Sequence, residues 1–170
     1  MAKWAFSKLE VPAQGNIMDI GCGGGYNVKR LLEASPQATV IGLDLSEESV
    51  RKARKINRQE IEKRCRIFKG SVEKLMFQDD QFDLVTAFET VFFWKDVDMA
   101  FGNIYRCLKN GGSFAVIHNY GDPKIDWEKK LPCMTRYTAE RIASFLSGSG
   151  FINVKISKKG NLFCVIGQKA

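Results

Sequence analysis

The sequence contains a single histidine, His118, and its cysteines are not spaced as metal ligands or as a redox pair. The five cysteines are Cys22, Cys65, Cys107, Cys133 and Cys164. Zinc sites draw on clustered cysteine and histidine ligands, so no metal site is expected. An odd number of scattered cysteines is typical of free thiols in a reducing compartment.

Long apolar runs are also missing, and none approaches the length that spans a bilayer. The apolar residues near the N-terminus are interrupted by Lys8 and Glu10, so a signal peptide is not expected. Internal repeats and low-complexity segments are absent. With 170 residues, of which 45% are hydrophobic, the sequence predicts one globular domain, residues 1–170, in the cytoplasm and without a membrane partner.

Positive charge is in excess, with a net charge of +7, and residues 47–66 contribute much of it. Such a segment could contact nucleic acid. Acidic residues are interspersed with the basic ones, however, and no aromatic residue lies between them to stack on bases. We therefore favour the solvated face of a helix and keep nucleic acid as the less favoured partner.

Residues 17–25 read as a short buried strand that runs into a glycine-rich turn, and helical spacing follows in residues 27–34. This order of elements opens a nucleotide-binding α/β unit. Glycine suits the turn because it permits positive φ and lets a ligand approach the backbone. A nicotinamide dinucleotide is disfavoured as the ligand, because Tyr26 occupies the third glycine position of the G-x-G-x-x-G pattern.

Apolar runs and helical spacing along the rest of the chain predict alternating strands and helices. The predicted strands are residues 16–20, 39–43, 65–69, 82–88 and 113–118, and the predicted helices are 2–9, 26–34, 46–64, 96–110 and 138–148. Residues 151–157 and 162–168 are predicted to form an antiparallel hairpin at one edge. The alternation predicts an α/β fold, with a mostly parallel sheet covered by helices on both faces. Residues 119–136 have the least pattern and are predicted to form a cap.

Five stretches resemble, in order and spacing, the motifs of class I S-adenosylmethionine-dependent methyltransferases. Residues 19–25 (Asp-Ile-Gly-Cys-Gly-Gly-Gly) are similar to the first motif. The others are the acidic end of the second strand at 42–46, the adenine loop at 70–75, the fourth-strand motif at 82–85 and the turn at 108–112. The resemblance implies a Rossmann-like, doubly wound, seven-stranded sheet, the cofactor S-adenosyl-L-methionine and the product S-adenosyl-L-homocysteine.

Asp44 closes the second predicted strand, and by the resemblance it binds the cofactor's ribose. A carboxylate can accept hydrogen bonds from two neighbouring hydroxyls. The alternative is that Asp44 caps the following helix, but Ser46 already supplies a cap. Leu45 would lie against the adenine or pack in the core.

The resemblance assigns further cofactor positions around the same sheet edge. Asp19 faces the methionine end of the cofactor, or it stabilises the turn without touching ligand. The other implied positions are Gly21, Cys22, Gly23, Phe88 and Glu89.

The adenine loop departs from the family pattern at Ser71, where an acid is common. A hydroxyl can still bond the adenine amine, and the backbone amide of Val72 would then carry more of the recognition. Glu73 could substitute for the missing acid, although a solvated surface glutamate is the favoured reading.

The methyl acceptor is predicted to be a small molecule. Catalysis is predicted to come mainly from holding this acceptor in line with the sulfonium methyl of the cofactor. Candidates for a general base are His118 and Tyr120, which follow the fifth strand. An aromatic acceptor wall could come from Trp94, Tyr120, Trp127 and Tyr137, or these could simply pack the cap. Because the cap is short, the pocket is either open or completed by a second subunit, as in a homodimer. Members of the family that the chain resembles usually carry a longer N-terminal segment over the cofactor, so part of this lid is expected to be missing here. An RNA or protein methyltransferase, and a non-catalytic cofactor-binding module, are the alternatives.

Overall fold

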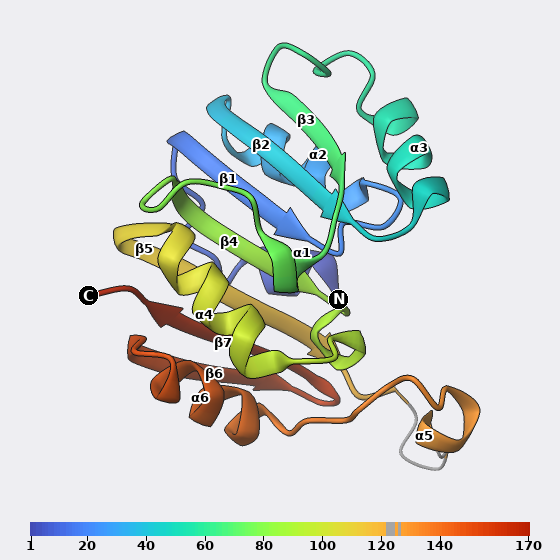
Figure 1. The fold of residues 1–170 in the computed structure, drawn as a ribbon, viewed down its shortest axis with the longest axis vertical. Coiled ribbons are helices and arrows are strands. Elements are labelled where there is room, and N and C mark those ends of the chain that lie inside the picture. Colours follow the sequence, from blue (N-terminus) through green and yellow to red (C-terminus); the bar gives the residue numbers. More distant parts are fainter. Residues whose placement is uncertain (122–124, 126) are drawn as a thin grey trace.

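In the computed structural model, which describes residues 1–121, 125 and 127–170, one seven-stranded sheet has the order β3-β2-β1-β4-β5-β7-β6 (Figure 1). The strands β1 to β5 pair in parallel, and β7 is antiparallel to both of its neighbours. The predicted mostly parallel sheet with an antiparallel C-terminal hairpin at one edge is confirmed, and β6 is the edge strand. The strands are β1 (Gln14–Ile20), β2 (Gln37–Asp44), β3 (Cys65–Lys69), β4 (Phe82–Phe88), β5 (Leu108–Asn119), β6 (Ile152–Lys159) and β7 (Leu162–Gln168).

Helices cover both faces of the sheet because alternate strand residues point to opposite sides. Ile17 and Leu84 pack in one cluster with the first helices, whereas Met18 and Val85 pack in another with the later ones. The helices are α1 (Ala2–Phe6), α2 (Tyr26–Ala34), α3 (Glu47–Ile56), α4 (Val97–Cys107), α5 (Trp127–Lys130) and α6 (Ala139–Gly148), with 3-10 turns η1 (Val72–Lys74) and η2 (Val91–Phe93). Figure 1 shows α4 and α6 in front of the sheet and α1 and α2 behind it.

Several predicted boundaries were wrong, and three of them have a clear physical cause. Helix α3 ends at Ile56 and not near residue 64, because the buried side chain of Asn57 donates to the carbonyls of Ala53 at 2.9 Å and Gly25 at 3.0 Å. Helix α1 ends at Phe6, where Ser7 turns back to bond the Trp4 carbonyl at 2.6 Å.

The start of β5 is the third difference. The strand begins at Leu108 and not at residue 113, because Leu108 is fully buried and pairs with Phe82. Its register shifts before Ser113. Gly112 fits there because a Cβ would lie only 2.9 Å from the Lys109 carbonyl.

The predicted cap, 119–136, is described only in part, since residues 122–124 and 126 lie outside the described residues. The side chain of Trp127, proposed for the acceptor wall, also lies outside them. Across the described part of the chain, no helix combines the length and apolar character needed to cross a membrane.

Candidate functional site

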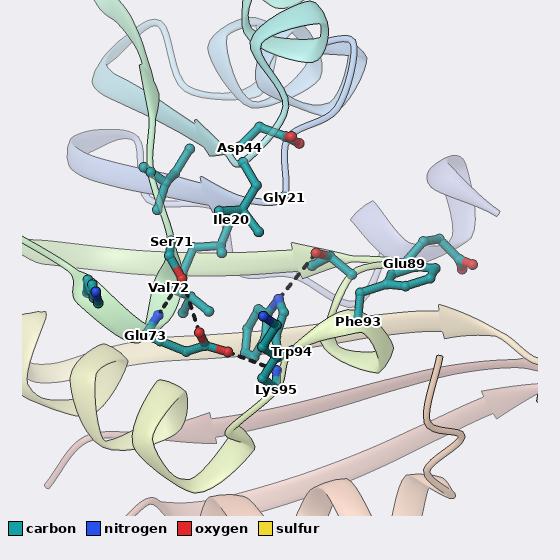
Figure 2. Close-up of a pocket in the computed structure, with 15 residues that line it drawn as sticks. Ile20, Gly21, Asp44, Ser71, Val72, Glu73, Glu89, Phe93, Trp94 and Lys95 are labelled. Carbon is teal, nitrogen blue, oxygen red and sulfur yellow. Dashed lines mark hydrogen bonds between the residues drawn. The ribbon is translucent and has the colours of Figure 1, made fainter. Parts of the chain in front are cut away.

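A cavity of about 560 Å³ lies where the carboxyl ends of β1, β2 and β4 meet (Figure 2). Its lining includes Ile20 and Gly21 at the end of β1, Asp44 at the end of β2, and Glu89 just after β4. This is the position at which open α/β sheets bind ligands, and the volume suits a small molecule. The cavity is therefore the candidate site.

The glycine turn has a different requirement at each position. Gly21 has φ +68°, and a Cβ there would lie 2.1 Å from Thr90 Oγ1, so only glycine fits. Gly23 also has positive φ, but nothing lies within 4 Å of its Cβ position, which leaves its side open. The Cys22 side chain is buried in the core beside Val28 and does not line the cavity. At Cys22 only backbone atoms could reach a ligand.

Asp44 joins the glycine turn to the start of α3. Its Oδ2 accepts from the Gly23 N–H at 2.8 Å, and its Oδ1 accepts from the Ser46 N–H at 2.9 Å. The helix itself is capped by Ser46, whose Oγ accepts from the Ser49 N–H. Asp44 is therefore not needed as the helix cap. Each of its oxygens keeps accepting capacity toward the cavity.

Asp19 is buried behind the glycine turn and is not part of the cavity lining. The Thr86 hydroxyl donates to its Oδ1 at 2.7 Å. Among the described residues, its Oδ2 has no hydrogen-bond partner. Burial raises the pKa of Asp19 to about 7, the charge of Asp44 adds to this, and the Thr86 bond opposes it. The carboxyl thus sits where its negative charge is poorly compensated.

The cavity lining also contains Leu45, Ser71 and Val72. Leu45 is 68% exposed, so it is an apolar surface that a ligand could cover and not a core residue. The Ser71 hydroxyl caps η1 by accepting from the Glu73 N–H at 3.2 Å.

Glu73 is not the solvated surface residue that we favoured from the sequence. Its Oε1 accepts from the backbone N–H of Lys95 at 2.8 Å (Figure 2). The same oxygen accepts from the backbone N–H of Asp96 at 3.3 Å. It thereby ties the η1 loop to the loop before α4. Nothing in the local sequence pattern indicated this, because the two segments are about twenty residues apart.

Phe88 and Glu89 do not share a side as predicted. Phe88 is 5% exposed and stacks on Phe6 of α1, with ring centroids 5.7 Å apart, so it does not line the cavity. The reason is strand alternation, which places Phe88 on the same face as Leu84. Glu89 does line the cavity.

Neither predicted base lines the cavity. His118 is 6% exposed and stacks on Phe92, with centroids 3.5 Å apart. Burial and the charge of Arg136 lower its pKa to about 4, so it is neutral at pH 7. Burial raises the pKa of Tyr120. A proton-accepting role for either is not supported by this arrangement.

Of the proposed acceptor wall, Trp94 lines the cavity and Tyr137 does not; Tyr137 packs on Phe92 at 5.8 Å. Trp94 Nε1 donates to Thr90 Oγ1 at 3.3 Å. Sequence reasoning missed Thr90 and Phe93, which also line the cavity. A signal was available only for Phe93, which belongs to the apolar run 91–94 that follows Glu89 and Thr90.

Comparison with known proteins identifies the family. Residues 18–116, more than half of the chain, match the family model described as a methyltransferase domain. The chain is 32% identical over 120 residues to the uncharacterized methyltransferase YcgJ of Bacillus subtilis, and the match spans 69% of this chain but only 46% of that protein.

In two further comparisons, the match covers a larger share of the other protein. Identity is 26% over 181 residues to the demethylmenaquinone methyltransferase of Lactobacillus johnsonii, with 90% of this chain and 74% of that protein covered. A Methanococcus maripaludis structure described as an S-adenosylmethionine-dependent methyltransferase superposes with a TM-score of 0.79 at 26% identity, over 99% of this chain and 83% of that one. The chain therefore belongs to the methyltransferase-domain family of class I S-adenosylmethionine-dependent methyltransferases, as its motifs predicted, and S-adenosylmethionine is the cofactor of that family.

Proposed function

We propose that residues 1–170 act as one domain that binds S-adenosylmethionine in the 560 Å³ cavity and transfers its methyl group to a small molecule. The observation that carries this proposal is the composition of this cavity. One end has Asp44 and Leu45, which suit a nucleoside, and the other has Glu89 and Phe93. A cofactor and an acceptor can therefore meet in one space.

The residues around the cavity fit the cofactor. Asp44 keeps lone pairs for two ribose hydroxyls after accepting from Gly23 and Ser46, and charge-assisted bonds of this kind contribute about 1.5–3 kcal/mol each. Leu45 offers an exposed apolar face for the adenine, and Ser71 and Val72 offer polar atoms at its edge. The open side of Gly23 would let the methionine part approach the backbone.

The bound cofactor supplies a methyl group that is already activated on a positive sulfur. The task left to the protein is therefore to hold the acceptor atom in line with the bond between that sulfur and the methyl carbon. Positioning of this kind can contribute up to roughly 7–11 kcal/mol. A small-molecule acceptor is supported by the modest cavity volume and by the Lactobacillus johnsonii relative, whose name gives demethylmenaquinone as its substrate. Help from a second subunit stays a prediction.

An RNA acceptor is the weaker candidate. Arg51, Lys55 and Arg58 are exposed on and just after α3 and make no ion pair within the described part of the chain. Helix α3 packs on β2 and β3, whereas the acceptor end of the cavity lies beyond β4. A polyanion bound along α3 would thus not reach the acceptor end directly.

Calorimetry with S-adenosylhomocysteine and with NAD tests the cofactor. We expect saturable binding of the former only, and tight NAD binding without binding of the former would refute the proposal. Transfer of a labelled methyl group to a panel of phenol, amine and quinol acceptors then separates an enzyme from a non-catalytic module. An RNA methyltransferase would instead bind RNA with a steep dependence on salt.

A further inference from the structure

Glu89 is held in a backbone conformation that is uncommon for a glutamate. Its φ is +58°, in the left-handed region that residues other than glycine seldom adopt. Its N–H donates to the Ile117 carbonyl at 2.9 Å, and its Oε1 accepts from the Asn119 N–H at 2.6 Å. These bonds to the end of β5 fix the carboxylate at the rim of the cavity.

The charge of this carboxylate is poorly compensated by the protein. The imidazole of His118 lies beside it, with Nδ1 3.4 Å from Oε2, but that imidazole is neutral because its pKa is lowered to about 4. The Asn119 bond and the N-terminal ammonium favour the anion, yet burial outweighs them and raises the pKa of Glu89 to about 7. A cation placed beside Oε2 would offset this cost.

An exposed aromatic ring lines the same part of the cavity. Phe93 is 46% exposed, and Figure 2 shows it with Glu89 on the side away from Ser71 and Val72. The cationic side chain labelled in that view, Lys95, lies on the Glu73 side instead. A carboxylate and an aromatic face together form a favourable site for an organic cation.

We propose that Glu89 and Phe93 form a subsite for an organic ammonium group, and that this group belongs to the methyl acceptor. The second part rests on the proposed methyl transfer. Glu89 would first pair with the ammonium and then take a proton from it on Oε2. The freed nitrogen lone pair forms the N–CH₃ bond while the S–CH₃ bond breaks and its electrons return to sulfur. The proton passes from Glu89 to water.

The test is a titration with benzylammonium chloride at pH 8, and with benzyl alcohol as the neutral match, with and without saturating S-adenosylhomocysteine. Wild type should bind benzylammonium at least about tenfold more tightly than benzyl alcohol. Glu89→Gln should lose this preference and keep its affinity for S-adenosylhomocysteine. Glu33→Gln changes an exposed glutamate on α2, outside the cavity lining, and should behave as wild type.

Equal binding of benzylammonium and benzyl alcohol by wild type would overturn the proposal, and so would an unchanged preference for the amine in Glu89→Gln. A tenfold loss of S-adenosylhomocysteine affinity in Glu89→Gln would also overturn it, because that loss would assign Glu89 to the cofactor. If Glu89→Gln does not fold, Phe93→Leu replaces it, and benzylammonium binding should weaken about two- to fivefold. Unchanged binding there would likewise refute the subsite. Failure of wild type to bind S-adenosylhomocysteine would count against the proposed function alone, because the amine titration is also run without it.

Discussion

Replacing Asp19 with asparagine should make the protein more stable at pH 8 and remove part of its pH dependence. The carboxyl is 1% exposed, and its pKa rises from 3.8 to about 7 on folding. Between these values the folded state binds more protons than the unfolded state, so stability falls as the pH rises and levels off above pH 7. The asparagine side chain cannot ionise, so the Asp19→Asn variant avoids this loss.

The size of the effect follows from the shift. About three pKa units at 1.36 kcal/mol each correspond to about 4 kcal/mol, of which roughly 2–3 kcal/mol falls between pH 5 and pH 8. The amide keeps an acceptor for the Thr86 hydroxyl, but it places a donor where Oδ2 has no partner among the described residues, at a cost of about 1–3 kcal/mol. The net gain at pH 8 is therefore about 1–3 kcal/mol, and it should vanish or reverse at pH 5.

Urea unfolding of both proteins, followed by tryptophan fluorescence at four pH values from 5 to 8, measures this difference. Glu89 and His118 also titrate with shifted pKa values, but their contributions are common to both proteins and largely cancel. Asp98→Asn, at an exposed position on α4, should follow wild type within about 1 kcal/mol. A difference between Asp19→Asn and wild type that does not change with pH would refute the reasoning, because it would mean that burial does not hold this carboxyl protonated.

Other variants test the remaining parts of the site. Asp44→Ala should weaken S-adenosylhomocysteine binding at least about tenfold by calorimetry, and an unchanged affinity would remove Asp44 from the ribose. Gly21→Ala should destabilise the protein by about 1–3 kcal/mol in urea unfolding, because the new Cβ would lie 2.1 Å from Thr90 Oγ1. The control is Gly102→Ala on α4, where the new Cβ meets nothing within 4 Å, and there the free energy of unfolding should rise by about 0.5–1 kcal/mol. Thr86→Val removes the hydroxyl donor of the buried carboxyl and should cost about 1–3 kcal/mol at pH 8; a neutral result would show that water replaces the bond.

The order of the strands and helices could be predicted from the sequence because it depends on local periodicity. The end of α3 could not, because it depends on Asn57 reaching the Gly25 carbonyl, 32 residues away in the chain. Within the site, the glycine turn and Asp44 were identifiable from spacing. The position of Glu73 was not, since its partners are the backbone amides of Lys95 and Asp96.

Three acids lie at the carboxyl ends of neighbouring strands. They differ in how well their negative charge is compensated, and this difference comes from their surroundings and not from their sequence positions. Asp44 accepts from two backbone amides, whereas Glu89 accepts from one and Asp19 from one hydroxyl. The last two have pKa values raised to about 7, so each would gain from a positive ligand group nearby. A dinucleotide would instead bring phosphate charges toward this edge and raise those pKa values further. The electrostatics thus favour a cofactor with a positive centre and no phosphate, independently of the tyrosine at position 26 that first argued against a dinucleotide.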